Sequence, residues 1–513
     1  MADSRTQKAK LNIIVSLLSQ AVTLICGFAI PRLMLDAFGS EVYGATASIA
    51  QFLAYITLLD GGIGAVARAA LYKPLAQNDM RKVSVITDQV KRFFRIISYI
   101  FVIYVLVLAC SFKSLSQTEV LDQVSSFLLV LVISLSTFAQ YFIGISYSVL
   151  LQAAQQTYIT TGISALTTVL NTFLVFILVN RNCDIIIVKL VSSCVFAIRP
   201  VFLRTYVKKN FSLEKNITSK ENLLQQKWNA LGQHIAYFLH SNTDIAVLTV
   251  FADLKTVAVY SVYNMVAAQI QNIATAFATG MEALFGDMLA KKETKQLHET
   301  FDYYETLISL TSITLFATTA ALIIPFIRIY TTGVTDANYI EPIFGLILIL
   351  SSVLYCLRLP YHALVTAAGH FKRTQFAAYG EAGINIVLSI VLVAKLGLVG
   401  VAIGTVIATA FRFGFYVIYL SNNIFEREVS KAIKRFLVNL SNFVLAFLIG
   451  RFVGGLFSAE NYVQWAISAV AVGGSVTLIT VAMNLVFYCN NTKSIIFWLL
   501  RKKALKTKIP ECR

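Results

Sequence analysis

Two apolar runs near the C-terminal third decide the class of fold: residues 374–394 (TQFAAYGEAGINIVLSIVLVA) and 397–422 (GLVGVAIGTVIATAFRFGFYVIYLSN). Each run has the length of about 20 residues that a helix needs to cross a bilayer. Only Lys395 and Leu396 separate them. The strands of an outer-membrane barrel would instead be short segments of alternating polarity. The two runs therefore predict a pair of transmembrane helices joined by a short connection.

The rest of the chain has the same character. Its 513 residues are 57% hydrophobic and only 13% charged, whereas soluble proteins carry about 25% charged residues. Fourteen spans of about 20 residues would use about 280 residues, close to this apolar supply. No remaining stretch is long enough for a separate nucleotide-binding, catalytic or DNA-reading domain. The sequence also lacks a Gly-rich phosphate loop ending in Lys-Ser or Lys-Thr, so we do not expect an ATP-driven pump.

We therefore expect an all-α, polytopic integral membrane bundle of about 14 transmembrane helices and no cofactor. The seven cysteines are dispersed without a CxxC pair, which argues against a disulfide framework or a metal site. The apolar run at 11–30 follows a basic start without a clear cleavage site, so we interpret it as a retained first span. The expected spans lie near 11–30, 44–67, 93–112, 126–149, 159–180, 185–206, 229–251, 256–285, 304–330, 340–365, 374–394, 397–422, 436–457 and 463–489.

The basic residues predict the orientation of these spans, because Lys and Arg near span ends stay on the cytoplasmic side. With the start inside, 33 of the 43 Lys and Arg residues fall in inner segments and 7 in outer ones. This asymmetry predicts an even number of spans with both termini in the cytoplasm. Most of the net charge of +17 then reflects the basic residues that orient the spans in the membrane. No basic soluble surface is left that could bind nucleic acid.

Weak internal similarity suggests a duplicated core of six spans. Val42-Tyr43 aligns with Val259-Tyr260 at an offset of 217, and Asn171 aligns with Asn385 at an offset of 214. Chance similarity among Leu, Val and Ala runs is the alternative. An even-numbered repeat places a cavity between two lobes of the same orientation. The expected organisation is an N-terminal six-helix lobe (1–206), a cytoplasmic linker (207–228), a C-terminal six-helix lobe (229–425), helices 13 and 14 (426–490) and a basic cytoplasmic tail (491–513). The linker is either an interfacial amphipathic helix or a solvated connection.

Ionisable residues at bilayer depth are the candidate functional residues, since each costs roughly 2.5 to 3.5 kcal/mol to insert. Asp60 lies in the glycine-rich stretch 59–64 (LDGGIG). Residues four apart in sequence share one face of a helix. Three pairs have this spacing: His240 with Asp244, Arg358 with His362, and Glu381 with Asn385. Pairs such as Asp60 with Arg68, or Asp244 with Arg358, could also simply neutralise charge between packed helices. We interpret His240 as a satisfied polar residue rather than a metal ligand, because no second His or Cys shares its face.

Four arginines are harder to explain by charge balance alone: Arg68, Arg199, Arg358 and Arg412. Guanidinium groups match phosphate oxygens in a bidentate manner and favour an anionic, phosphate-bearing cargo. A drug exporter for cations would prefer a chamber lined by carboxylates. No outer loop is long enough for the acceptor site of a membrane glycosyltransferase or polymerase, so we do not expect an enzyme and assign no catalytic residue.

Several motifs carry a family resemblance along about the first 425 residues. The chain resembles the bacterial polysaccharide repeat-unit flippases (O-antigen and capsule type), a branch of the multidrug/oligosaccharidyl-lipid/polysaccharide exporter superfamily. The motifs are Pro31-Arg32 with Gly39 and Tyr43-Gly44, the stretch 59–64, Asn242-Thr243-Asp244, Ala258-Val259-Tyr260-Ser261, and above all Ala367-Ala368-Gly369-His370 through Glu381-Ala382-Gly383-Ile384-Asn385 to residues 396–405 (LGLVGVAIGT).

The resemblance implies two six-helix lobes that carry undecaprenyl-pyrophosphate-linked oligosaccharides to the outer leaflet of the bacterial inner membrane by alternating access. This would serve lipopolysaccharide, capsule or exopolysaccharide assembly, with membrane lipids and a polymerase or assembly complex as candidate partners. Residues that would attract the pyrophosphate or acidic sugars are Arg32, Arg68, Arg199, Arg358 and Arg412. Those for ion coupling or charge balance are Asp60, Asp244, Glu381 and His362.

Three alternatives remain open from the sequence. A flippase for the peptidoglycan precursor lipid II shares the architecture and the cationic cavity. A multidrug or cation antiporter of the same superfamily would depend on Asp60 or Asp244. A membrane glycosyltransferase or polymerase would incorporate sugar itself.

Overall fold

The structure is a computed structural model that describes residues 2–60, 62–214, 231–276, 281–424 and 427–500. Within these ranges the chain forms helices and no strand, which confirms the all-α class. Most of the expected linker, from residue 215 onward, and the expected tail beyond residue 500 lie outside the described residues. The chain divides into two compact units, which we call the N-terminal unit (1–265, 333–338 and 389–401) and the C-terminal unit (266–332, 339–388 and 402–513).

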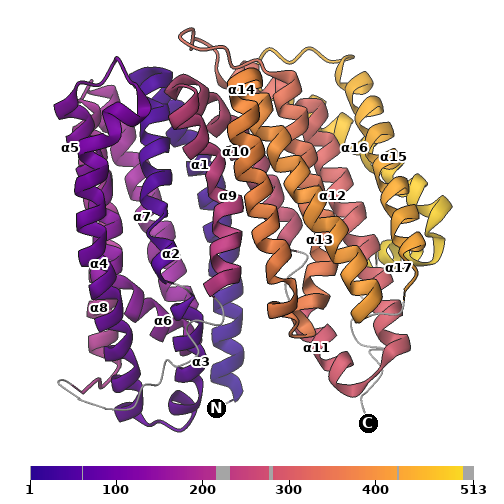
Figure 1. Ribbon diagram of the computed structural model, residues 1–513, viewed down its shortest axis with the longest axis horizontal. Coiled ribbons are helices and arrows are strands. Elements are labelled where there is room, and N and C mark those ends of the chain that lie inside the picture. The colour runs from indigo at the N-terminus through magenta and orange to yellow at the C-terminus, as the bar shows by residue number, and fades with distance from the viewer. Residues whose placement is uncertain (1, 61, 215–230, 277–280, 425–426, 501–513) are drawn as a thin grey trace. The chain divides into compact units, whose positions relative to one another are not determined.

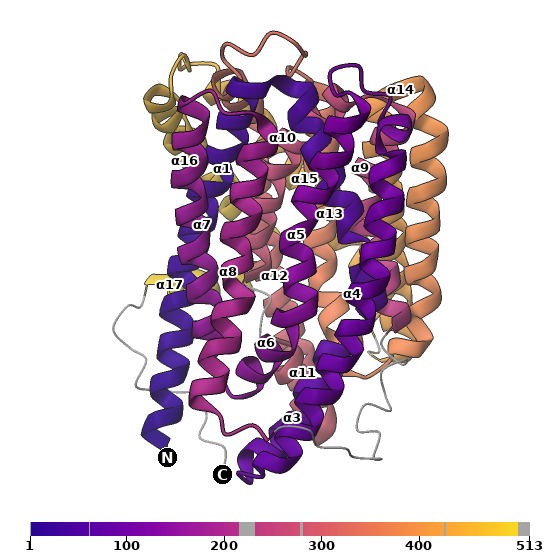
Figure 2. The ribbon, with the colours of Figure 1, turned by 90° about the vertical axis from the view of Figure 1, so that its left-hand side faces the viewer.

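The N-terminal unit is a bundle of long helices with short breaks. Helices α4, α5, α8 and α7 lie side by side in that order, and α1 packs on α7 (Figure 2). The helices of this unit are α1 (Ala2–Ala54), α2 (Thr57–Asp60), α3 (Ile63–Ala76), α4 (Met80–Ser116), α5 (Gln123–Ala139), the π-helix η1 (Gln140–Gly144), α6 (Ile145–Ala153), α7 (Thr157–Asn180), α8 (Ile185–Asn210), α9 (Leu231–Phe251) and the first half of α10 (Leu254–Ala276).

The C-terminal unit is built around α12, which contacts α13, α15 and α16 (Figure 1). Helix α14 continues past the chain reversal at its middle, and α17 follows α16 directly. The helices of this unit are the second half of α10, α11 (Met281–Lys291), α12 (Thr294–Tyr330), α13 (Pro342–Ala367), α14 (Phe371–Asn423) apart from residues 389–401, α15 (Val429–Gly454), α16 (Tyr462–Phe487) and α17 (Cys489–Leu500).

These helices account for the expected number of spans. Ten helices of the described residues are long and apolar enough to cross a membrane. Two of the ten, α1 and α14, are each divided by a glycine with positive φ, Gly39 (76°) and Gly397 (54°). Each therefore supplies two spans, and α9 and α10 cover the expected seventh and eighth spans. The result agrees with about fourteen transmembrane helices.

Helix α4 shows how local sequence produces such a span. Asp79 caps its start by accepting a hydrogen bond from the backbone N–H of Lys82 at 3.0 Å, which satisfies one of the free donors of a helix N-terminus. Phe94 and Phe101 are buried on one face, whereas Ile96 and Ile103 are exposed. Exposed apolar side chains are stable when lipid replaces water, so α4 has a protein-facing and a lipid-facing side.

The break between the first two spans is fixed by a distant residue. The backbone N–H and the hydroxyl of Ser40 both donate to the carboxylate of Asp336, each at 2.7 Å. At the neighbouring Gly39, a Cβ would lie 2.9 Å from the same carboxylate. One turn later, a Cβ on Gly44 would lie 1.8 Å from the carbonyl oxygen of Leu254. Both glycines therefore allow a close approach that any side chain would block.

The glycine-rich stretch 59–64 interrupts the expected second span. Helix α1 ends at Ala54, α2 covers only Thr57–Asp60, and α3 starts after Gly62, which has a φ of 74°. Left-handed backbone is accessible to glycine at low cost. The chain thus changes direction beside Asp60 instead of continuing as one straight helix.

Candidate functional site

A buried ion pair joins α13 to α14. The guanidinium Nη1 of Arg358 contacts carboxylate Oε1 of Glu381, and the two side chains are only 8% and 7% exposed. Arg358 also lies over the ring of Tyr355, 4.8 Å from its centroid. Charges removed from water are stable only when they are paired. The structure supplies Glu381 as the partner of Arg358, a pairing that the sequence did not single out.

A second buried arginine, Arg412, lies on α14 and has no carboxylate partner in the described chain. Arg412 is 4% exposed. Its Nη2 donates to the hydroxyl of Tyr416 at 2.7 Å, and its guanidinium carbon lies 4.6 Å from the centroid of that ring. Its Nε and Nη1 atoms have no hydrogen-bond partner in the part of the chain that the structure describes. Because these donors cost free energy while they stay unmet, Arg412 is prepared to receive an acceptor.

His362 belongs to the same neighbourhood. Its ring lies edge-on to Tyr416 with 5.8 Å between centroids, and it is near enough to Arg358, Glu381 and Arg412 for their charges to act on it. Four residues that the sequence had singled out therefore lie together in the C-terminal unit. The two guanidinium groups and one carboxylate leave an excess of one positive charge. Such an arrangement can bind an anion through charge-assisted hydrogen bonds.

Arg199 lines a separate polar pocket in the N-terminal unit. Its Nε donates to the Thr167 hydroxyl at 2.5 Å, and its Nη2 donates to the Thr168 hydroxyl at 3.0 Å and the Ser164 carbonyl at 3.2 Å. The guanidinium carbon lies 4.4 Å from the centroid of Phe196. The pocket has a volume of about 370 Å³ and borders the π-helix η1. π-Helical turns occur frequently at functional sites.

The remaining candidates of the N-terminal unit have local partners. Asp60 accepts a hydrogen bond from Tyr141 at 3.4 Å. Arg68 donates to the side-chain oxygen of Gln152 at 2.5 Å. Because Gly62 breaks the helix between them, Asp60 and Arg68 do not follow one another along a single helical face.

Arg32 lies close to the end of the first span. It forms an ion pair of 2.9 Å with Asp36, and the two side chains are 26% and 45% exposed. Exposed pairs of this kind contribute little to stability.

Asp244 is buried on α9 and accepts a hydrogen bond from the hydroxyl of Tyr260 on α10 at 2.9 Å. The side chain of His240 lies outside the described parts of the chain. Among the residues that are described, no group of three or more His, Cys, Asp or Glu side chains could hold a metal ion.

The sequence analysis missed a buried charge network around Glu305 of α12. One carboxylate oxygen accepts the hydroxyl of Tyr361 at 2.5 Å, and the other contacts Arg427 at 3.0 Å and Arg435 at 3.1 Å. Both arginines fall between the expected spans 397–422 and 436–457. Helical periodicity could have revealed Glu305, because it shares the buried face of α12 with Phe301 and Ile308 at spacings of four and three.

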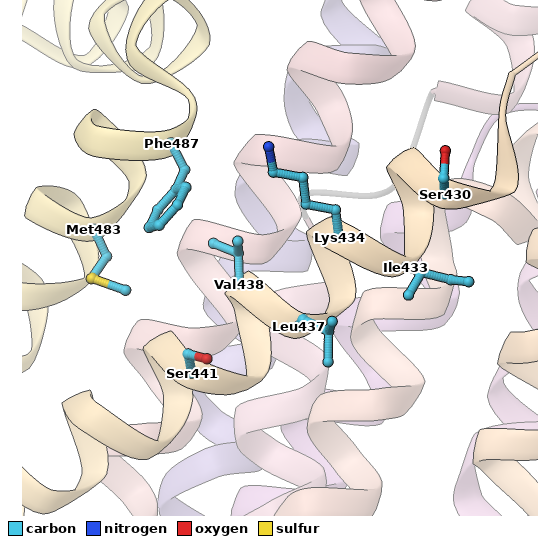
Figure 3. A pocket seen from close by; sticks show the side chains of 8 residues that line it. All are labelled: Ser430, Ile433, Lys434, Leu437, Val438, Ser441, Met483 and Phe487. Atoms are coloured by element: carbon cyan, nitrogen blue, oxygen red, sulfur yellow. The ribbon is translucent and has the colours of Figure 1, made fainter.

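Helices α15 and α16 line an open apolar pocket of about 440 Å³ (Figure 3). Val438 on α15 faces Met483 and Phe487 on α16, and Lys434 supplies the one cation of the lining. Such a surface suits hydrocarbon chains with an anionic group near one end.

Comparisons with known proteins agree with this architecture. Residues 230–391 match the MatE family. No curated protein sequence matches the chain. The matched region includes Arg358, Glu381 and His362.

Three solved structures of similar fold are titled as transport proteins. A structure titled as lipid II flippase MurJ in an inward closed conformation matches with a TM-score of 0.68 and 17% identity over 95% of this chain and 99% of that chain. An inward-facing multidrug resistance MATE family transporter of the MOP superfamily matches with a TM-score of 0.58 and 15% identity over 80% and 98% of the two chains. A mutant of the Vibrio cholerae MATE transporter VcmN matches with a TM-score of 0.53 and 14% identity over 82% and 99%. At these identities the likeness establishes the fold.

Proposed function

We propose that this protein is a flippase that moves undecaprenyl-pyrophosphate-linked oligosaccharide units from the cytoplasmic to the outer leaflet by alternating access. It acts in the bacterial inner membrane with both termini in the cytoplasm. Its cargo then enters surface polysaccharide assembly, where a polymerase or assembly complex is the expected partner.

The observation that carries this proposal is the unmet hydrogen-bonding capacity of Arg412. A guanidinium that is 4% exposed and has two unpartnered donor atoms in the described structure is costly unless an anion occupies the site for part of the cycle. The neighbouring Arg358 is already neutralised by Glu381. Phosphate oxygens are the acceptors that a guanidinium fork matches best. A diphosphate head group would satisfy Arg412 and engage Arg358 as the pair with Glu381 loosens.

The arginines outside this cluster would act along the path of the same cargo. Arg199 and Arg68 are anchored by neutral hydroxyl and amide oxygens, so both retain their full positive charge. A neutral partner orients a guanidinium without cancelling its attraction for phosphate. Arg32 would contact the anionic group near the outer end of the path.

Carboxylates would couple transport to an ion gradient or to the membrane potential. Asp60 and Asp244 each accept a hydrogen bond from a tyrosine hydroxyl, and a phenol can stay in place whether the carboxylate is charged or protonated. Glu381 is held by Arg358 and would change its charge only when that pair opens. Asp60 and Asp244 are therefore the better coupling candidates, and Glu381 with His362 would balance charge in the cluster.

Transport of lipid II is the second candidate function. The lipid II flippase structure covers 95% of this chain, whereas the multidrug transporters cover 80% and 82%. The additional coverage favours a lipid-linked cargo over a soluble drug. The apolar pocket between α15 and α16 gives a lipid chain a surface to lie on under either assignment.

Reconstitution can distinguish these functions. The full-length protein is placed in liposomes with one of three probes: undecaprenyl-pyrophosphate-linked oligosaccharide, fluorescent lipid II, or a cationic dye. A glycosidase or quencher confined to the outside measures how much lipid probe reaches the outer leaflet. We expect translocation of the oligosaccharide-lipid and little of the other two probes. Lipid II translocation alone would support the second candidate, and dye transport alone would refute both.

The decisive variant is Arg412→Gln, which keeps hydrogen-bonding groups but removes the charge. We expect it to abolish translocation at normal membrane abundance. Arg451→Gln is the matched control, because Arg451 is an exposed arginine at the end of α15. Normal transport by Arg412→Gln would refute the role of the cationic cluster.

A further inference from the structure

A second cationic cavity lies in the N-terminal unit, and its lining contains none of the residues discussed above. It has a volume of about 500 Å³, within the usual range for small-molecule pockets, and is formed by α4, α6, α8 and the residues that follow α8. Its lining consists of Ser84, Thr87, Asp88, Lys91, Tyr147, Arg204, Lys208, Phe211, Leu213 and Glu214.

Three cations converge on this cavity from two helices. Lys91 comes from α4, and Arg204 and Lys208 come from consecutive turns of α8. Arg204 and Lys208 lie close enough to Lys91 for their charges to repel it. Within the described ranges, none of the three head groups has a hydrogen-bond or ion-pair partner. Like charges held together without a counter-ion are destabilising unless an anion joins them.

The two acidic residues of the lining offset only part of this positive charge, since Asp88 attracts Lys91 but is shared with an arginine. Asp88 forms an ion pair with Arg92 on the next turn of α4 at 2.7 Å. Glu214 is exposed, and its backbone N–H donates to the hydroxyl of Ser84 at 3.0 Å. The segment after α8 is thereby tied to α4, which closes one side of the cavity. The cavity therefore has a net positive charge. The hydrogen bond between the Glu214 backbone and the Ser84 hydroxyl helps to set its shape.

The position of the cations along the helices indicates the source of the anion. On α4, Lys91 precedes the exposed apolar side chains Ile96 and Ile100, and on α8 the exposed Ile198 and Phe202 precede Arg204. Exposed apolar residues mark the part of each helix that meets lipid tails. On both helices the cations therefore lie just beyond the lipid-facing segment, at the depth of the phosphate groups of the bilayer.

We propose that this cavity binds the phosphate of an acidic membrane phospholipid, with Lys91, Arg204 and Lys208 contacting the phosphate. The acyl chains lie along the exposed apolar faces of α4 and α8. A bound lipid would bridge the two helices at their ends and hold the segment that follows α8. This inference depends on the membrane-spanning fold and not on the cargo of the transporter.

Native mass spectrometry of the detergent-purified full chain tests the proposal. Phosphatidylglycerol is the acidic probe, phosphatidylcholine the zwitterionic probe, and inorganic phosphate the competitor. We expect phosphatidylglycerol to stay bound and phosphatidylcholine to dissociate. The variant with Lys91→Gln, Arg204→Gln and Lys208→Gln should lose about a hundredfold in affinity for phosphatidylglycerol, because each cation near the membrane surface contributes roughly fivefold.

The matched control carries Arg81→Gln, Lys82→Gln and Lys209→Gln, which removes three charges from the same two helices outside the cavity lining. It should bind phosphatidylglycerol like the unmodified chain. Equal losses in the two triple variants would overturn the proposal, since the effect would then be general charge. Displacement of the lipid by millimolar inorganic phosphate would overturn the lipid assignment. If the cavity variant fails to fold, Arg204→Gln alone should still show about a fivefold loss.

Discussion

Glu305 of α12 and Arg435 of α15 form an ion pair in which Oε2 and Nη1 are 3.1 Å apart and both side chains are no more than 5% exposed. Arg435 also donates to the hydroxyl of Thr306, and Arg427 contacts the same carboxylate oxygen at 3.0 Å. The pair connects α12, the central helix of the C-terminal unit, with α15. It therefore fixes where α15 packs, and with it the pocket that α15 forms with α16.

The first prediction concerns this connection. Glu305→Gln leaves the buried Arg435 without a carboxylate and leaves Arg427 only its contact with the more exposed Asp302 at 3.5 Å. Breaking a buried pair typically costs about 3 to 5 kcal/mol. We expect a large fall in the thermal unfolding midpoint of the purified chain. Glu460→Gln, at an exposed position, should leave the midpoint unchanged. Equal midpoints for the two variants would show that the network contributes no stability.

The second prediction tests the close contact at Gly44. Gly44→Ala places a Cβ 1.8 Å from the carbonyl oxygen of Leu254, so the helix and the start of α10 must separate. We expect loss of folded protein, measured as the monodisperse fraction after extraction. Gly414→Ala is the control, because nothing lies within 4 Å of its Cβ position. It should be neutral or slightly stabilising, since alanine favours helix by about 1 kcal/mol over glycine.

The third prediction concerns the contact between Asp336 and Ser40. Asp336→Ala removes both hydrogen bonds at the break after Gly39, whereas Ser40→Ala removes only the hydroxyl bond. Each charge-assisted bond contributes about 1.5 to 3 kcal/mol. Asp336→Ala should therefore lower the unfolding midpoint clearly more than Ser40→Ala. The opposite order would contradict the assignment of Asp336 as the residue that fixes the break.

The fourth prediction separates structure from transport at the pair of Arg358 and Glu381. Glu381→Leu alone leaves a buried, uncompensated guanidinium, so its membrane abundance should fall. The double variant Arg358→Met with Glu381→Leu removes both charges, and buried pairs can often be replaced by apolar residues without loss of stability. We expect normal abundance but strongly reduced glycan export, measured in cells that depend on this protein. Full export by the double variant would exclude a role for the pair in transport.

Some features of the fold and of the candidate site could be predicted from the sequence, and others could not. The apolar runs and the breaks near Gly39 and Gly397 follow from local composition, and the helices agree with them, whereas the break at Gly62 falls inside the expected span 44–67. Arg358, His362, Glu381 and Arg412 were recognisable as charges at bilayer depth, and the structure brings them together. Their pairing was not predictable, because it depends on how α13 and the two halves of α14 rotate against each other.

The sequence by itself determined the all-helical class, the approximate spans and the residues that could not face lipid. These properties depend on hydropathy along a short stretch of chain and on the cost of placing a charge in hydrocarbon. Only the tertiary structure decided that Glu305 binds Arg427 and Arg435, that Arg412 keeps two unpartnered donors in the described chain, and that Lys91 and Arg204 line one cavity. These contacts join residues from different helices, and the packing of side chains that sets helix rotation leaves no periodic signal in the sequence.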